Sequence, residues 1–156
     1  MTEARFYHLL RLPLERALPQ LLERCLARSW RAVVRVGSGA RVEALDQHLW
    51  TFQDRSFLPH GTARDGEAAH QPIWITDGPD VPNGARVLFL ADGAAVEDPA
   101  PFDLICDLFD GNDDDAVAAA RARWTRLREL GLTLTYWQQN ADGGWIEQAR
   151  HTPAGA

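Results

Sequence analysis

The chain of 156 residues has no lysine, because all 16 of its basic residues are arginine. This absence excludes a Walker A lysine, a Schiff-base lysine and a lysine general base. Acidic residues number 22, so the formal net charge is −6, and the isoelectric point lies near 5.3. Extensive binding to a nucleic-acid backbone takes many basic contacts. The composition therefore argues against a general nucleic-acid binder.

Cysteine is scarce, and long apolar runs are missing. The two cysteines, Cys25 and Cys106, lie in separate apolar stretches, which favours buried thiols over a disulfide or a metal site. No stretch approaches the roughly 18 consecutive apolar residues of a membrane span, and the N-terminal residues do not resemble a secretory signal. We expect a cytoplasmic protein without membrane contact, with one domain over residues 1–150 and a frayed tail at 151–156.

Motifs for catalysis are also missing. The histidines and serines are scattered, and neither GxSxG nor HExxH occurs. The glycine-containing turn at 36–41 is of the kind that can cradle a phosphate, but it matches neither nucleotide-binding pattern, so a plain tight turn is the simpler interpretation. The carboxylates between 107 and 115 could hold a divalent cation, although capping of the next helix explains them more simply. We expect no catalytic residue, metal or cofactor.

Strand and helix patterns alternate along the chain. Apolar or alternating runs predict strands at 4–10, 31–36, 72–76, 86–92, 102–109 and 132–139, and a hairpin returning through 145–150. Helical patterns cover 13–28, 40–49 and the segment that ends near Gly131, with Pro13 in a first turn and Pro19 expected to bend its helix. Residues 61–71 resemble a mobile surface loop. This order predicts a three-layer α/β/α single domain with a mostly parallel, Rossmann-like sheet and no nucleotide-binding motif.

The last of these helices reverses the charge of the chain. Between 116 and 130 it carries four arginines and one glutamate, a local +3. On a helical period Trp124 falls on the apolar face, and Arg121 and Arg128 form a ridge beside it. A pocket with this indole as a wall and arginines at its rim would suit an acidic peptide that ends in an aromatic residue and a free carboxylate. Large aromatic residues are more often core, and capture of single-stranded DNA by arginine and tryptophan is a further alternative.

An ordered set of short motifs resembles the chi subunit of bacterial DNA polymerase III holoenzyme. The motifs are FY at 6–7, CLARSWRAVVRV at 25–36, the spacing of LW, SF and PH within 43–61, the apolar strand that ends in Phe109, and AARARWTRLRELGL at 119–132. The resemblance implies a non-catalytic accessory subunit of the clamp-loader assembly. In that family the subunit links the replicase to the acidic C-terminal tail of single-stranded DNA-binding protein, and it also binds the psi subunit.

The resemblance also implies two sets of binding residues. The tail-binding positions correspond to Trp50, Arg121, Trp124 and Thr125. The interface with psi, or with another partner such as a DNA helicase, corresponds to Phe57, Phe109, Asp110 and Arg128. Two lysines that flank the family pocket correspond here to Val117 and Thr125, which predicts weaker tail binding unless Arg126 or Arg123 compensates from a different helical angle. Asp110 stands where better-known members have an apolar residue, so we expect an altered psi interface. An alternative from another class is a small nucleotide-binding α/β enzyme.

Overall fold

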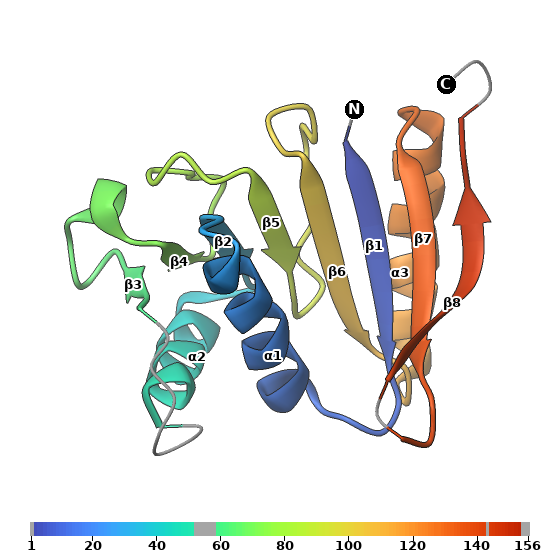
Figure 1. Cartoon of the computed structure of the whole chain (residues 1–156), viewed down its shortest axis with the longest axis horizontal. Helices are drawn as coiled ribbons and strands as arrows, with labels where there is room; N and C mark the ends of the chain where they lie inside the picture. The colour runs from blue at the N-terminus through green and yellow to red at the C-terminus, as the bar shows by residue number, and fades with distance from the viewer. Residues whose placement is uncertain (1, 52–58, 143, 154–156) are drawn as a thin grey trace.

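A mostly parallel sheet forms the middle layer of the protein (Figure 1). The computed structural model describes residues 2–51, 59–142 and 144–153. Within these residues the sheet has eight strands in the order β3-β4-β2-β5-β6-β1-β7-β8. Neighbouring strands are parallel except for β7 and β8. The strands are β1 (Glu3–Leu9), β2 (Ala32–Arg35), β3 (Gly61–Thr62), β4 (Ile73–Thr76), β5 (Val87–Leu90), β6 (Leu104–Asp110), β7 (Thr133–Gln139) and β8 (Trp145–His151).

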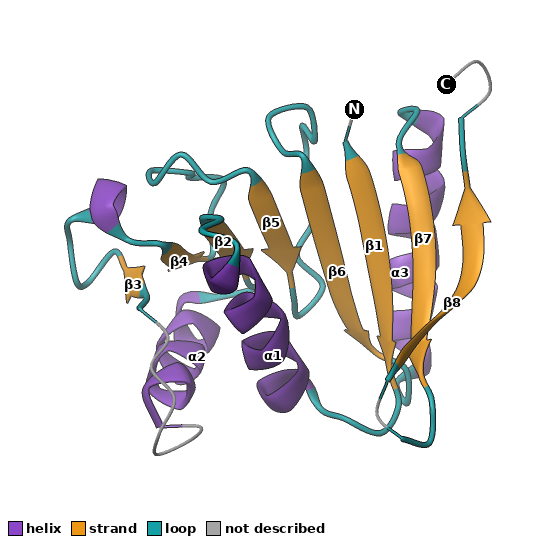
Figure 2. Cartoon of the chain, viewed as in Figure 1, coloured by secondary structure: helices purple, strands orange, loops and turns teal. Residues whose placement is uncertain are grey.

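Helices cover both faces of this sheet (Figure 2). They are α1 (Leu14–Ala27), α2 (Gly39–Thr51) and α3 (Asp114–Glu129), with a short 3-10 helix η1 (Ala68–His70). Alternate residues of β1 point to opposite faces, so Tyr7 belongs to the core under α1 and α2, and Phe6 to the core under α3. Both cores are built from apolar residues of the central strands. The expected three-layer α/β/α fold is confirmed.

The structure differs from two local expectations. Residues 61–71 are not simply a surface loop, because Gly61 and Thr62 pair in parallel with β4 and both are buried. The side chain of Asp65 accepts hydrogen bonds from the backbone N–H and the hydroxyl of Thr62, which closes the turn after this strand. At the other end, His151 is the last residue of β8, so the strand continues one residue past the expected boundary at 150. None of the helices described is long and apolar enough to span a membrane.

The N-terminal helix tolerates its internal proline because a histidine from α2 replaces a missing donor. Pro13 is the N-cap of α1 rather than a residue of its first turn, and the helix continues through Pro19. Proline has no N–H, so the carbonyl of Glu15, four residues earlier, loses its helical partner. His48 Nε2 lies 2.5 Å from that carbonyl oxygen. The contact ties α1 to α2 on one face of the sheet.

Candidate functional site

The four arginines of α3 divide into two pairs. Arg126 donates to the backbone carbonyls of Val96 and Glu97, and Arg123 pairs with Asp107. These two side chains hold α3 against the sheet and its loops. Arg121 and Arg128 are exposed and make no side-chain hydrogen bond or ion pair to any other described residue. The positive charge available to a partner on this helix therefore comes mainly from Arg121 and Arg128.

The pair between Arg123 and Asp107 is a structural contact beneath α3. Arg123 Nε lies 2.6 Å from Asp107 Oδ2, and its Nη2 lies 3.0 Å from Oδ1, which is the bidentate geometry of a strong pair. Only 1% of the Asp107 side chain is exposed. Burial raises the pKa of Asp107 above its ordinary value, and the bonds from Arg123 act in the opposite direction. Arg123 therefore serves the core rather than a ligand.

A cavity of about 420 Å³ lies between α3 and the sheet. Its lining residues come from four strands and α3, namely Phe6, Phe109, Val117, Ala120, Arg121, Trp124, Tyr136 and Ala149. Trp124 meets Phe6 edge to face, with ring centroids 5.3 Å apart and an interplanar angle of 68°. Tyr136 lies 6.4 Å from Trp124, centroid to centroid, at 79°. The result is an apolar, aromatic cavity, and Arg121 is the one charged side chain among the described residues that line it.

His8 lies on β1 beside the aromatic side chains that line this cavity. Its Nδ1 is hydrogen-bonded to the hydroxyl of Tyr136. Burial lowers the pKa of His8 below its ordinary value, and the nearby positive charge of Arg121 lowers it further. The hydrogen bond to the backbone at Gly111 and the negative charge of Asp110 raise it. The cavity is therefore bordered by a histidine whose pKa depends on Arg121, which also lines the cavity.

The structure brings together part of each predicted binding set. Arg121 and Trp124 from the predicted tail-binding set and Phe109 from the partner set line the same cavity. Thr125 lies next to Trp124 in sequence but does not line the cavity, and its hydroxyl donates to the carbonyl of Arg121, 3.1 Å away. Thr125 is exposed beside the cavity.

Trp50 is separated from the other residues predicted to bind the tail. It lies on α2, in the layer on the opposite side of the sheet from α3, and its ring stacks on His60 at 4.2 Å between centroids. Trp50 therefore does not line the same cavity as Arg121 and Trp124, and its grouping with them rests on the family resemblance alone. Trp50 is 45% exposed and is available for a separate contact.

The predicted partner-interface residues are also spread out. Phe57 lies outside the described residues. Asp110 ends β6, whereas Arg128 lies in the last turn of α3. From Asp114 to Arg128 an α-helix rises roughly 21 Å, at 1.5 Å for each residue. Asp110, which precedes the N-terminus of α3, and Arg128, near its C-terminus, therefore lie far apart. A partner that contacts both must extend along the helix.

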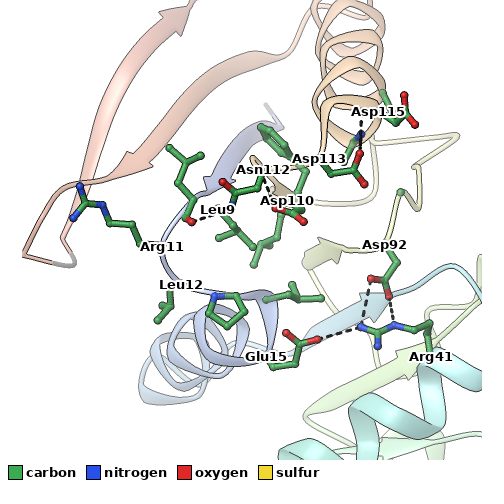
Figure 3. Close-up of a pocket in the computed structure, with 18 of the residues that line it drawn as sticks. Leu9, Arg11, Leu12, Glu15, Arg41, Asp92, Asp110, Asn112, Asp113 and Asp115 are labelled. Atoms are coloured by element: carbon green, nitrogen blue, oxygen red, sulfur yellow. Dashed lines mark hydrogen bonds and ion pairs between the residues drawn. The ribbon is translucent and has the colours of Figure 1, made fainter.

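A larger crevice opens at the carboxyl ends of β1 and β6 (Figure 3). The helices that follow these adjacent strands, α1 and α3, go to opposite faces, which makes this the topological switch point where α/β folds often bind ligands. Its volume is about 780 Å³. Arg41 is bound there by Asp92 at 2.8 Å and by Glu15 at 3.6 Å. The basic group nearest the glycine turn is thus already paired with carboxylates.

The acidic cluster in this crevice caps α3. Asp113 is the N-cap, and its Oδ1 accepts from the backbone N–H groups of Asp115 and Ala116 at 2.9 and 3.3 Å. Asp110 accepts from the backbone N–H of Asn112. The capping interpretation is confirmed at Asp113. In the described ranges no group of three His, Cys, Asp or Glu residues is arranged to hold a metal.

Comparison with known proteins assigns the chain to a family. A family model described as "DNA polymerase III chi subunit, HolC" matches residues 1–135. The chain belongs to the chi subunit family. A curated relative, the probable DNA polymerase III subunit chi of Rickettsia prowazekii (strain Madrid E), is 33% identical over 90 residues, which are 58% of this chain and 54% of that protein. The chain thus matches about half the length of this relative. The chi match ends at residue 135, within β7, so β8 lies beyond it.

Sequence reasoning missed the strand residues of the cavity in this chi-family chain. Phe6 was noted as part of a strand and of the FY motif, Tyr136 only as part of a strand, and His8 and Ala149 were given no role. Their alternation along β1, β7 and β8 indicated which residues share a face, but it did not indicate that α3 covers that face. That information depends on the strand order, in which β1 lies between β6 and β7.

Proposed function

We propose that this protein is a non-catalytic accessory subunit of the replicative DNA polymerase III clamp-loader assembly. It links that assembly to single-stranded DNA-binding protein by binding the acidic C-terminal tail of that protein. Membership of the chi subunit family supports the assembly. The observation that carries the tail-binding proposal is the cavity in which an aromatic lining and one free arginine, Arg121, lie together.

The chemistry of the cavity favours a peptide with an aromatic C-terminal residue. The side chain of that residue would pack among Phe6, Trp124 and Tyr136, where aromatic pairs contribute beyond their buried area. The terminal carboxylate would accept hydrogen bonds from Arg121, whose planar group suits a carboxylate. Acidic residues earlier in the peptide would be attracted to Arg128 along the helix. The terminal residue therefore supplies most of the specificity.

Charge-matched variants test this proposal. A short acidic peptide ending in phenylalanine with a free carboxylate is titrated into the wild type and into Arg121→Ala by calorimetry at low salt. We expect Arg121→Ala to weaken binding by about tenfold or more, since a hydrogen bond to a charged group contributes about 1.5–3 kcal/mol. Arg128→Ala removes the same charge from the same helix but does not line the cavity, so its effect should stay below about threefold. Equal losses from the two variants would contradict a specific site.

A second partner, psi or a substitute for it, would bind outside the cavity. The resemblance assigns Phe57, Phe109, Asp110 and Arg128 to it. Of these, Phe109 lines both the tail cavity and the neighbouring crevice, whereas Asp110 and Arg128 do not line the cavity. A carboxylate at Asp110 favours a basic group on the partner at this position. A DNA helicase is a further candidate for the same face. Co-purification from the native cytoplasm identifies which partner is present.

The two other classes of function are less favoured by the geometry. A nucleotide phosphate at the crevice would meet Asp110, Asp113 and Asp115 near the N-terminus of α3, which repel an anion. Direct capture of single-stranded DNA relies on several arginines, whereas Arg123 and Arg126 are engaged in internal contacts. A rise in melting temperature on addition of ATP, GTP or NAD would support the alternative of a small nucleotide-binding enzyme. Tight binding of an oligonucleotide alone would support the DNA-binding alternative.

A further inference from the structure

His8 controls a hydroxyl group in the wall of the aromatic cavity. The residue lies on β1 two positions after Phe6 and therefore faces α3. Its ring packs against Phe109 with centroids 5.1 Å apart, and against Tyr136 with centroids 5.6 Å apart at 87°. Its Nδ1 is hydrogen-bonded to the Tyr136 hydroxyl. The direction in which Tyr136 can donate is thus set by His8.

The contacts of His8 with the Gly111 backbone and with the Tyr136 hydroxyl together fit one tautomer of the neutral ring. A Cβ atom at residue 111 would lie 2.0 Å from Nε2, so only glycine permits this close approach. The hydrogen bond between His8 and the Gly111 backbone raises the pKa of His8, which means that the ring donates and the carbonyl accepts. A neutral imidazole has one donor and one acceptor. In neutral His8, Nδ1 must therefore accept the hydroxyl hydrogen of Tyr136.

The net effect of its surroundings lowers the pKa of His8, which favours the neutral ring at neutral pH. The charged and titratable groups around the ring are Tyr136 on β7, Asp110 at the end of β6 and Arg121 on α3. Burial is the largest influence and lowers the pKa of His8, as does Arg121, while Asp110 acts in the opposite direction. In this state the hydrogen of Tyr136 is committed to His8. The hydroxyl cannot at the same time donate to a ligand.

We propose that His8 is a positioning residue that makes Tyr136 a second anion donor of the tail-binding cavity. This inference rests on the proposed function. When His8 takes a proton from solvent, Nδ1 becomes a donor to the Tyr136 oxygen, and the hydroxyl hydrogen turns toward the carboxylate that Arg121 holds. Arg121 and Tyr136 then donate to the same group from α3 and from β7. The cavity binds an acidic C-terminus more tightly as His8 becomes protonated.

The sign of the pH dependence follows from linkage. Because the complex favours the protonated ring, the pKa of His8 is higher in the complex than in the free protein. Affinity then rises as the pH falls through the pKa of the complex, and it is constant again below the pKa of the free protein. The carboxylates of the peptide stay ionised above about pH 5.5, since their ordinary pKa values are near 4. The change between about pH 8 and pH 6 therefore belongs to the protein.

The same acidic peptide ending in phenylalanine tests this inference at two pH values. Wild-type protein should bind it about fivefold to tenfold more tightly at about pH 6 than at about pH 8, the scale of one added hydrogen bond to a charged group. His8→Leu leaves Tyr136 free to donate at every pH, so its affinity should be nearly independent of pH. Tyr136→Phe removes the donor and should bind more weakly than the wild type at about pH 6. His70→Leu, at an exposed histidine of η1, is the matched control and should keep the wild-type profile.

A measurement on the unmodified protein does not depend on how the variants fold. The ring signals of His8, followed by NMR through a pH titration, should show a higher pKa when the peptide is present. An unchanged His8 titration, or wild-type binding that does not vary with pH, overturns this inference and leaves the proposed function standing. If the wild-type protein does not bind the peptide at either pH, both this inference and the proposed function are overturned.

Discussion

The four arginines of α3 have different roles because their side chains have different surroundings. Arg123 lies against a buried carboxylate and Arg126 against two backbone carbonyls, whereas Arg121 borders an aromatic cavity. Counting charges along the sequence treats these arginines alike. Their different roles depend on which of them face β6 and the loop after β5. The local charge of +3 predicted a binding surface on α3, but it overstated how many of the helix's arginines are free of internal contacts.

Loss of the structural arginine should destabilise the fold. In Arg123→Met, Asp107 stays buried without its partner, so we expect the free energy of unfolding to fall by about 3–5 kcal/mol. Urea denaturation measures this change. The double variant Asp107→Leu/Arg123→Met removes both charges and should recover much of the loss. A single variant as stable as the wild type would show that the pair does not hold α3 in place.

At the scale of the elements, regular patterns identified the long helices and strands, and pairing decided the rest. β7 and β8 were expected as a hairpin and form one, because alternating residues and the turn between them are local signals. β3 was missed because it has two residues and exists only through its bonds to β4. The cavity was only partly predicted for a similar reason. Trp124 and Arg121 share one helix, while Phe6, Tyr136 and Ala149 come from strands far apart in sequence.

The start of α3 offers a test at this scale. Asp113→Ala removes the two hydrogen bonds that cap the helix, so the free energy of unfolding should decrease by about 1 kcal/mol. Thermal or urea unfolding followed by circular dichroism measures the change. Asp114→Ala removes a neighbouring carboxylate that does not cap the helix, and it should cost only a few tenths of a kcal/mol through the helix dipole. Equal effects at both positions would mean that charge alone, without capping, stabilises this end of α3.

At the scale of the whole molecule, the crevice at the strand ends and the cavity under α3 differ in charge and in lining. The crevice at the strand ends carries several carboxylates, while the cavity under α3 has a single arginine and aromatic walls. We therefore expect an acidic peptide to prefer the cavity under α3, since the carboxylates of the crevice outnumber its arginines. The overall composition argued against general nucleic-acid binding, but it could not indicate whether the crevice or the cavity suits an anion. That distinction required the three-dimensional position of each charged side chain.

The terminal carboxylate of the peptide is the group on which the proposed function depends most. Two peptides of the same acidic sequence ending in phenylalanine, one with a free C-terminus and one amidated, are titrated into the wild type and into Arg121→Ala. We expect amidation to weaken binding to the wild type by about tenfold, since it removes a charge-assisted contact. Amidation should have little effect on Arg121→Ala, which already lacks the partner of that carboxylate. Equal binding of the two peptides by the wild type would contradict the assignment of Arg121 and the aromatic cavity as the tail-binding site.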